Sequence, residues 1–176
     1  MPLSMHQASV PVFTQLLTAL SGVIDIAAAH CAEKGVDPSS FLEMRLAPDM
    51  FTFTQQVQRA TYHASNTVAQ LAQLKTPEFD DNQTSFDDLK RRIAWTLADI
   101  ASVDPELLDG SEERQIENQV RIGVLVLPGL DFLLQFALPQ VLFHTTTAYD
   151  ILRHGGVDIG KKDYLGPLPY RDMQLS

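Results

Sequence analysis

The apolar residues of this chain follow a helical spacing over most of its length. In the first segment they recur in steps of three and four, which places them on one buried stripe: Phe13, Leu17, Leu20, Ile24, Ala27 and Cys31. We expect this helix to span about residues 5–33, with Gly35 just past its end. A short helical connection is expected to begin at Asp37-Pro38 and to run through Arg45.

Two further stripes predict two more helices, at about residues 52–73 and 85–102. The first begins with the capping-box spacing of Thr52 and Gln55, and its stripe is Phe53, Val57, Ala60, Ala64, Val68 and Leu71. The second follows a polar loop, and its stripe is Phe86, Leu89, Ile93, Leu97 and Ile100. On this helix, Asp87 with Arg91 and Asp88 with Arg92 have the i,i+4 spacing of surface ion pairs.

The apolar spacing then changes to a period of two, which predicts a β-hairpin at about residues 113–126. Its second strand is expected to hold four alternating apolar residues, Val120, Ile122, Val124 and Val126. We expect residues 113–117 to pair with it through a turn at Asn118-Gln119, with the valine face on the helices and Arg121 in solvent.

The last helix is expected at about residues 131–154, where Pro139 should kink or split it and Gly155-Gly156 end it. The tail, 157–176, is expected to be extended. The four helices can bury their stripes together, so we predict a single all-α domain over residues 1–176, a four-helix bundle with a hairpin between helices three and four.

Composition and charge narrow the range of partners and locations. The chain has 13 basic and 22 acidic residues and a net charge of -9, which disfavours nucleic acid and anionic membranes as partners. The N-terminal residues lack the pattern of a signal peptide, and we expect no membrane span, so the expected location is the cytoplasm. Cys31, the single cysteine, is expected to be a small buried residue.

Part of the sequence resembles a known family. The run FALPQVLFHTTTAYDILRHGGVDIGKKDYLG, the strand before it, and QQVQRA on the second helix are similar to an uncharacterised bacterial domain-of-unknown-function family among the DinB-like bundles. The resemblance implies an up-down-down-up topology with a long crossover between helices two and three. It also implies a metal chemistry, because DinB-like relatives hold a divalent ion with three histidines, one on helix two and two on helix four, and this ion activates a thiol cofactor or a water.

Only part of that metal site can be transferred to this chain. His63 and His144 match two of the three histidines, but Ala148 stands where the third is required. His154 cannot replace it, because ten residues of helix separate it from His144 by roughly 15 Å of rise. We therefore assign no metal or other cofactor to this chain, and a divalent ion is disfavoured. His63 and His144 are either pocket or ligand residues, or hydrogen-bonded residues of the core and its edge.

These observations leave two functional hypotheses. The favoured one is a small-molecule-binding or interaction module with an incomplete metal triad. The alternative is a DinB-like enzyme, of thiol transferase or hydrolase type, that uses a metal or a histidine base. Trp95 lies off the apolar stripe of the third helix, so either the tail or hairpin covers it or a second copy does. We expect a homodimer through that helix.

Overall fold

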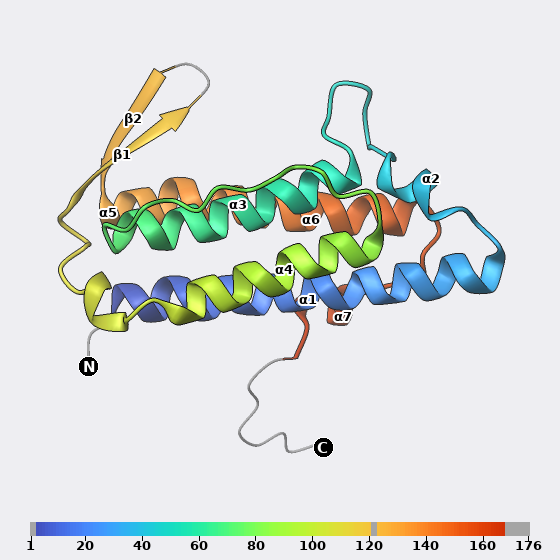
Figure 1. Cartoon of the computed structure of the whole chain (residues 1–176), viewed down its shortest axis with the longest axis horizontal. Coiled ribbons are helices and arrows are strands. Elements are labelled where there is room, and N and C mark those ends of the chain that lie inside the picture. The colour runs from blue at the N-terminus through green and yellow to red at the C-terminus, as the bar shows by residue number, and fades with distance from the viewer. Residues whose placement is uncertain (1–2, 121–122, 168–176) are drawn as a thin grey trace.

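The structure is a computed structural model that describes residues 3–120 and 123–167. Within these ranges the chain is mostly helical, and most of the fold lies in four long helices: α1 (Met5–Lys34), α3 (Phe53–Leu71), α4 (Phe86–Ser102) and α6 (Leu138–His154). α1 and α3 each pack against both α4 and α6 (Figure 1). The buried apolar residues of these helices form one continuous core.

The stripes expected from the sequence supply this core. Every stripe residue of α1 and α3 is buried, Cys31 included, and on α4 only Leu97 is partly exposed. α1 is long and apolar enough to cross a membrane by length and composition alone, although we expected no membrane span from the sequence. Buried core helices can have the same length and composition, and the stripe of α1 packs on the other helices.

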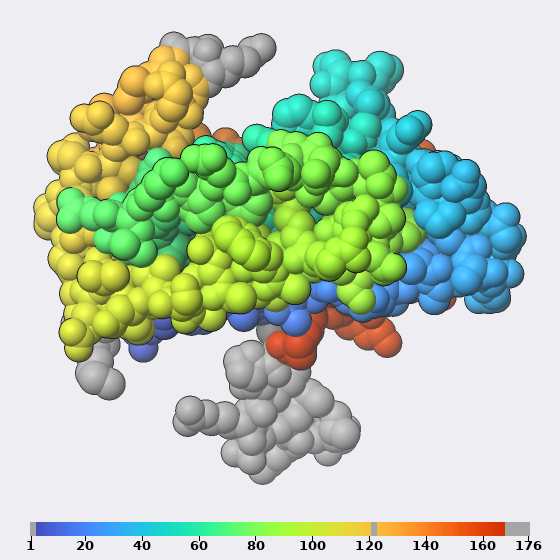
Figure 2. Space-filling view, viewed as in Figure 1, coloured from blue at the N-terminus to red at the C-terminus, as the bar shows by residue number. Residues whose placement is uncertain are grey.

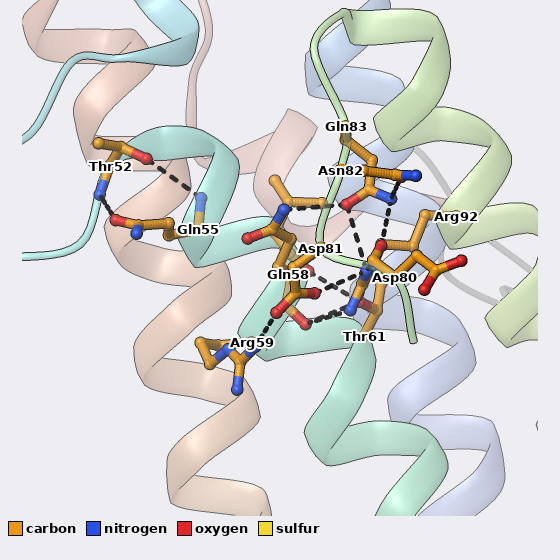
Figure 3. A network of polar contacts seen from close by, with 11 residues as sticks. Thr52, Gln55, Gln58, Arg59, Thr61, Asp80, Asp81, Asn82, Gln83 and Arg92 are labelled. Carbon is orange, nitrogen blue, oxygen red and sulfur yellow. Dashed lines mark hydrogen bonds and ion pairs between the residues drawn. The ribbon is translucent and has the colours of Figure 1, made fainter. Parts of the chain in front are cut away.

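The helix ends follow the predicted capping residues. Thr52 Oγ1 accepts a hydrogen bond from the backbone N–H of Gln55 at 3.3 Å, and Gln55 Oε1 accepts one from the N–H of Thr52 at 3.0 Å (Figure 3). α1 ends at Gly35, whose φ of 65° is readily adopted by glycine. α2 (Pro38–Leu42) begins after Asp37 as expected but ends before Arg45.

The connection between α3 and α4, residues 72–85, runs back along the bundle, so α3 and α4 point in the same direction (Figure 1). We call this segment the crossover. It is held by Arg92 of α4, whose guanidinium pairs with Asp81 of the crossover at 3.0 Å and donates to Thr61 Oγ1 of α3 at 2.7 Å (Figure 3). Arg92 also lies 4.4 Å from the ring centroid of Phe79.

The expected surface pair of Asp88 with Arg92 is therefore wrong. Arg92 is only 6% exposed, and Asp88 pairs with Arg91 instead. Helical spacing alone allowed either partner, but the crossover brings the carboxylate of Asp81 and the carbonyl of Asp80 over Arg92, which satisfies its guanidinium inside the protein.

The predicted hairpin exists, but its register differs from the prediction. After a short 3-10 helix, η1 (Pro105–Leu108), the strands are β1 (Gln115–Val120) and β2 (Gly123–Pro128), paired antiparallel. Asn118 and Gln119 therefore lie within β1 and do not form the turn. The predicted positions of Arg121 and Ile122 fall outside the described residues.

The altered register reverses the expected faces of the second strand. Val124 and Val126 are 57% and 50% exposed, so the prediction that they face the bundle is wrong. A shift of one residue moves every side chain of a strand to its other face. The inward face of β2 carries Leu125, paired with Asn118, and Leu127, paired with Ile116.

The last long helix is interrupted ahead of Pro139, as expected. It begins earlier than predicted with α5 (Gly129–Asp131), widens into the π-helical segment η2 (Phe132–Ala137), and continues as α6. The tail is not fully extended, because it contains α7 (Lys161–Leu165), whose Leu165 carbonyl accepts a hydrogen bond from Gln15 of α1 at 3.0 Å. Residues 168–176 of the predicted tail lie outside the described part of the chain.

Candidate functional site

The fold brings the two sequence-predicted histidines together. His63 projects from α3 and His144 from α6, and their ring centroids lie 5.5 Å apart with the ring planes within 8° of parallel. His144 is buried, and His63 is half-buried at the edge of the apolar stripe of α3. The two imidazoles therefore form one local site, although they lie 81 positions apart in the sequence.

Gln56 fixes the position and tautomer of His144. Its Oε1 lies 2.7 Å from Nδ1 of His144, while its Nε2 donates to the carbonyl of Phe51 at 3.3 Å. The amide oxygen thus faces the imidazole, so Nδ1 carries the proton and Nε2 carries the lone pair. Within the described ranges, no side chain or carbonyl forms a hydrogen bond with Nε2 of His144.

Both imidazoles are held in their neutral form. Burial lowers the pKa of His63 to about 3, helped by the neighbouring His144 and by the positive charge of Arg59. Burial also lowers the pKa of His144 to about 4, again with a contribution from Arg59. Desolvation disfavours the charged imidazolium, so both rings are uncharged at neutral pH.

A cavity of about 610 Å³ lies beside His63, between the hairpin and the bundle; we call it the hairpin cavity. Its walls come from α3, both strands, η2 and α6: Arg59, Tyr62, His63, Asn118, Gln119, Val120, Leu125, Phe136 and Gln140. Figure 2 shows the hairpin rising at one end of the bundle, apart from the connection between α2 and α3. The cavity is larger than the hollow of about 370 Å³ beside Trp95.

The hairpin wall is tied to α3 by side-chain amides. Asn118 Oδ1 of β1 accepts hydrogen bonds from Asn66 and Gln70 of α3, each at 3.2 Å. Asn66 in turn accepts a hydrogen bond from Thr76 of the crossover at 2.9 Å. Because Asn118 is buried and shared by two donors, it holds β1 at a fixed distance from the bundle.

The three-histidine metal site does not fit this chain. Ala148, at the position of the missing third histidine, is fully buried and has no donor atom. Over residues 3–120 and 123–167, no group of three or more His, Cys, Asp or Glu side chains is arranged to hold a metal ion. His154 is exposed at the far end of α6, as its separation from His144 predicted.

Sequence reasoning identified the histidines but missed two neighbours that define the site. Gln56 lies seven residues before His63, and Arg59 four residues before it, so both share one side of α3 with it. This spacing within QQVQRA was the signal that could have found them. Phe136 and the hairpin residues gave no such signal, because their contacts depend on the tertiary fold.

Comparison with known proteins identifies the family. No curated protein matches the chain. The solved structure of a DinB family member protein from Shewanella denitrificans is similar, with 37% sequence identity, a TM-score of 0.89 and coverage of 96% of both chains. The family model described as a domain of unknown function, DUF1993, matches residues 5–165. The chain therefore belongs to the DUF1993 family, and its fold is that of a DinB family member.

Proposed function

We propose that this chain is a binding module for a small organic molecule, which occupies the hairpin cavity beside His63. The observation that carries the proposal is the cavity itself, whose volume of about 610 Å³ lies within the usual range for small-molecule sites. Aromatic and aliphatic side chains alternate with amides around it, a mixture that suits a ligand with an apolar body and a few polar groups.

The state of the imidazoles supports binding over catalysis. A general base works best when its pKa lies near the working pH, whereas the pKa values of His63 and His144 are about 3 and 4. Such rings accept a proton poorly at neutral pH, but a neutral imidazole can still donate and accept hydrogen bonds. We therefore assign His63, which lines the cavity, to ligand recognition, and His144 to the support of His63 from behind.

One observation favours the alternative, a DinB-like enzyme that uses a histidine base. Gln56 orients His144 so that the lone pair of Nε2 meets no hydrogen-bond donor from the described part of the chain, which is the arrangement of an oriented base. This hypothesis requires substrate binding to raise the low pKa of the pair. An activity that depends on His144 and rises with an apparent pKa near neutrality would favour it.

A matched pair of variants tests the binding proposal. Leu125 lines the hairpin cavity, and the next residue, Val126, lies on the outer face of the same strand. The probe is a mixture of water-soluble aromatic acids, amides and alcohols, which we call the fragment mixture. We expect Leu125→Trp to fill the cavity and to abolish binding of these compounds. Saturation-transfer NMR should detect the same compounds on the wild type and on Val126→Trp. Equal binding to all three proteins would refute the assignment of the cavity as the binding site.

Metal content tests the metal-dependent form of the alternative. With two histidines in place and no third donor beside them among the residues that the structure describes, we expect protein purified without a histidine tag to hold far less than one tightly bound divalent ion per chain. Elemental analysis by mass spectrometry measures this directly. Stoichiometric zinc or nickel that is lost in His63→Ala or His144→Ala would contradict the proposal.

We also propose the finer features of the fold and assembly that the resemblance and the sequence imply. The parallel course of α3 and α4 in Figure 1 supports an up-down-down-up bundle. The inward packing of the α1 stripe supports a cytoplasmic location. Trp95 on α4, which is 48% exposed, supports a homodimer through this helix.

A further inference from the structure

Arg59 sets the charge of the hairpin cavity. Among the described residues that line it, Arg59 is the one charged side chain at neutral pH, because His63 is neutral and no lining residue is an aspartate or glutamate. The chain as a whole has a net charge of -9, so the positively charged wall of the cavity has the opposite sign to the protein as a whole.

The positive charge of Arg59 is only partly balanced. Asp81 of the crossover contacts Arg59 through Oδ2 at 2.5 Å and Arg92 through Oδ1 at 3.0 Å (Figure 3). Two guanidinium groups therefore share one carboxylate, and the cluster keeps one net positive charge. Its field reaches the histidines, because Arg59 contributes to the lowered pKa of both His63 and His144.

The guanidinium of Arg59 also keeps unused hydrogen-bond donors. Its terminal nitrogen Nη2 donates to Asp81, and no described residue accepts a hydrogen bond from its other nitrogens. Its central carbon lies 5.4 Å from the ring centroid of Tyr62, a contact that restricts the orientation of the group. An arginine held in this way can offer a pair of parallel N–H groups, which matches the geometry of a carboxylate.

We propose that the hairpin cavity binds a small monocarboxylic acid, with its carboxylate on Arg59 and its apolar body against Phe136 and Leu125. The inference rests on the proposed function and names the class of its ligand. A single net positive charge matches a monoanion better than the dianion of a phosphate monoester. Phe136 and Leu125 supply the apolar surface that a free inorganic anion would leave without a partner.

Three probes with one aromatic body test this assignment by titration calorimetry: 3-phenylpropanoate, 3-phenylpropanamide and 2-phenylethyl phosphate. We expect the carboxylate to bind tightest and the neutral amide to bind about tenfold more weakly, since charge-assisted hydrogen bonds are the stronger ones. Arg59→Gln should weaken carboxylate binding about tenfold and leave the amide unchanged. Arg91→Gln is the control, because Arg91 is exposed and lies outside the cavity.

Asp81→Asn separates ligand recognition from a structural role of the ion pair. If Arg59 binds the ligand, removing the competing carboxylate should tighten binding of 3-phenylpropanoate, most strongly at low salt. If the pair merely supports the wall, the same variant should weaken it, which would overturn the inference. Unchanged binding of 3-phenylpropanoate in Arg59→Gln would also overturn the inference. So would tighter binding of the amide or the phosphate than of the carboxylate, or no binding of the carboxylate at all.

These failures can be told apart from failure of the proposed function. In one outcome the acid does not bind, uncharged fragments do bind, and Leu125→Trp abolishes their binding. The carboxylate assignment is then wrong, and the cavity remains a binding site. If no member of the fragment mixture binds, both proposals are refuted.

Discussion

At the scale of single residues, the site consists of two neutral imidazoles next to one cation. His144 is oriented by Gln56, and His63 stands between His144 and the hairpin cavity. Burial and the charge of Arg59 both disfavour protonation of the rings. A site of this kind is prepared to receive an anion without binding a proton at the same time.

The neutral histidines predict a pH dependence of stability. Their folded pKa values, about 3 and 4, lie below the ordinary value of 6.5, so the unfolded state binds more protons as the pH falls below about 6.5. The free energy of unfolding should therefore decrease from about pH 6.5 to about pH 4, by at most about 1.4 kcal/mol per pH unit for each histidine.

Urea denaturation at several pH values checks this prediction, with His144→Gln as the comparison. The glutamine keeps a hydrogen-bond partner for Gln56 but does not titrate, so the pH dependence in this window should become weaker. Aspartates with a lowered pKa, such as Asp37 and Asp88, act only at lower pH, below about 4. A variant with the same slope as the wild type would contradict the assignment.

Sequence patterns could identify the histidines but not the environment that makes them a site. His63 and His144 were found by resemblance and helical position, and the loss of the third donor at Ala148 was visible directly. The low pKa values depend on burial by segments far away in sequence. Periodicity along one helix cannot report such contacts.

At the scale of elements, the crossover determines how α3 and α4 pack against each other. Arg92 of α4 donates to Thr61 Oγ1 and to the carbonyl of Gln58 on α3, and it pairs with Asp81 of the crossover (Figure 3). The crossover contributes the same Asp81 to the charge cluster of Arg59. One buried cation therefore couples the packing of the helices to the wall of the cavity.

This arrangement predicts unequal effects for two adjacent arginines. Arg92→Ala leaves Asp81 and several acceptors without their buried partner, so it should lower the free energy of unfolding by about 3 kcal/mol or more. Arg91→Ala removes an exposed side chain whose one ion pair within the described residues is with Asp88, and its effect should be small. Chemical denaturation measures both, and equal effects would refute the role given to Arg92.

Helices were predictable from this sequence, whereas strand register was not. The stripes of α1 and α3 follow from contacts within one helical repeat, and all of their residues are buried as expected. The faces of β2 depend on which residues form the turn, and the sequence offers no glycine-containing turn at Asn118-Gln119. The hairpin also relies on the hydrogen bond that Asn118 accepts from Asn66 of α3, which no local pattern reveals.

At the scale of the whole molecule, Trp95 is the main exposed aromatic residue of α4. Phe79 of the crossover meets its ring edge-on at a centroid distance of 5.2 Å. This neighbour was not among the two alternatives drawn from the sequence, which were cover by the tail or hairpin and cover by a second copy. Trp95 itself is 48% exposed. A second copy of the chain could bury this surface.

We therefore predict a homodimer that includes α4. Sedimentation equilibrium at micromolar concentration should give twice the mass of one chain, and Trp95→Ala should shift the equilibrium toward the monomer. Val126→Trp, which alters the distant hairpin, is the control and should leave the mass unchanged. A monomeric wild type would refute the dimer, and a dimer insensitive to Trp95→Ala would refute the assigned surface.

The most direct test of the proposed function is an NMR spectrum of the five histidine rings, recorded while the fragment mixture is added to isotope-labelled protein. If a small molecule enters the hairpin cavity, the ring signals of His63 should move with saturation, followed by those of His144 behind it. The signals of His6, His30 and His154, which lie outside the cavity lining, should stay in place. Fragment binding that leaves the His63 signals unchanged would contradict the account.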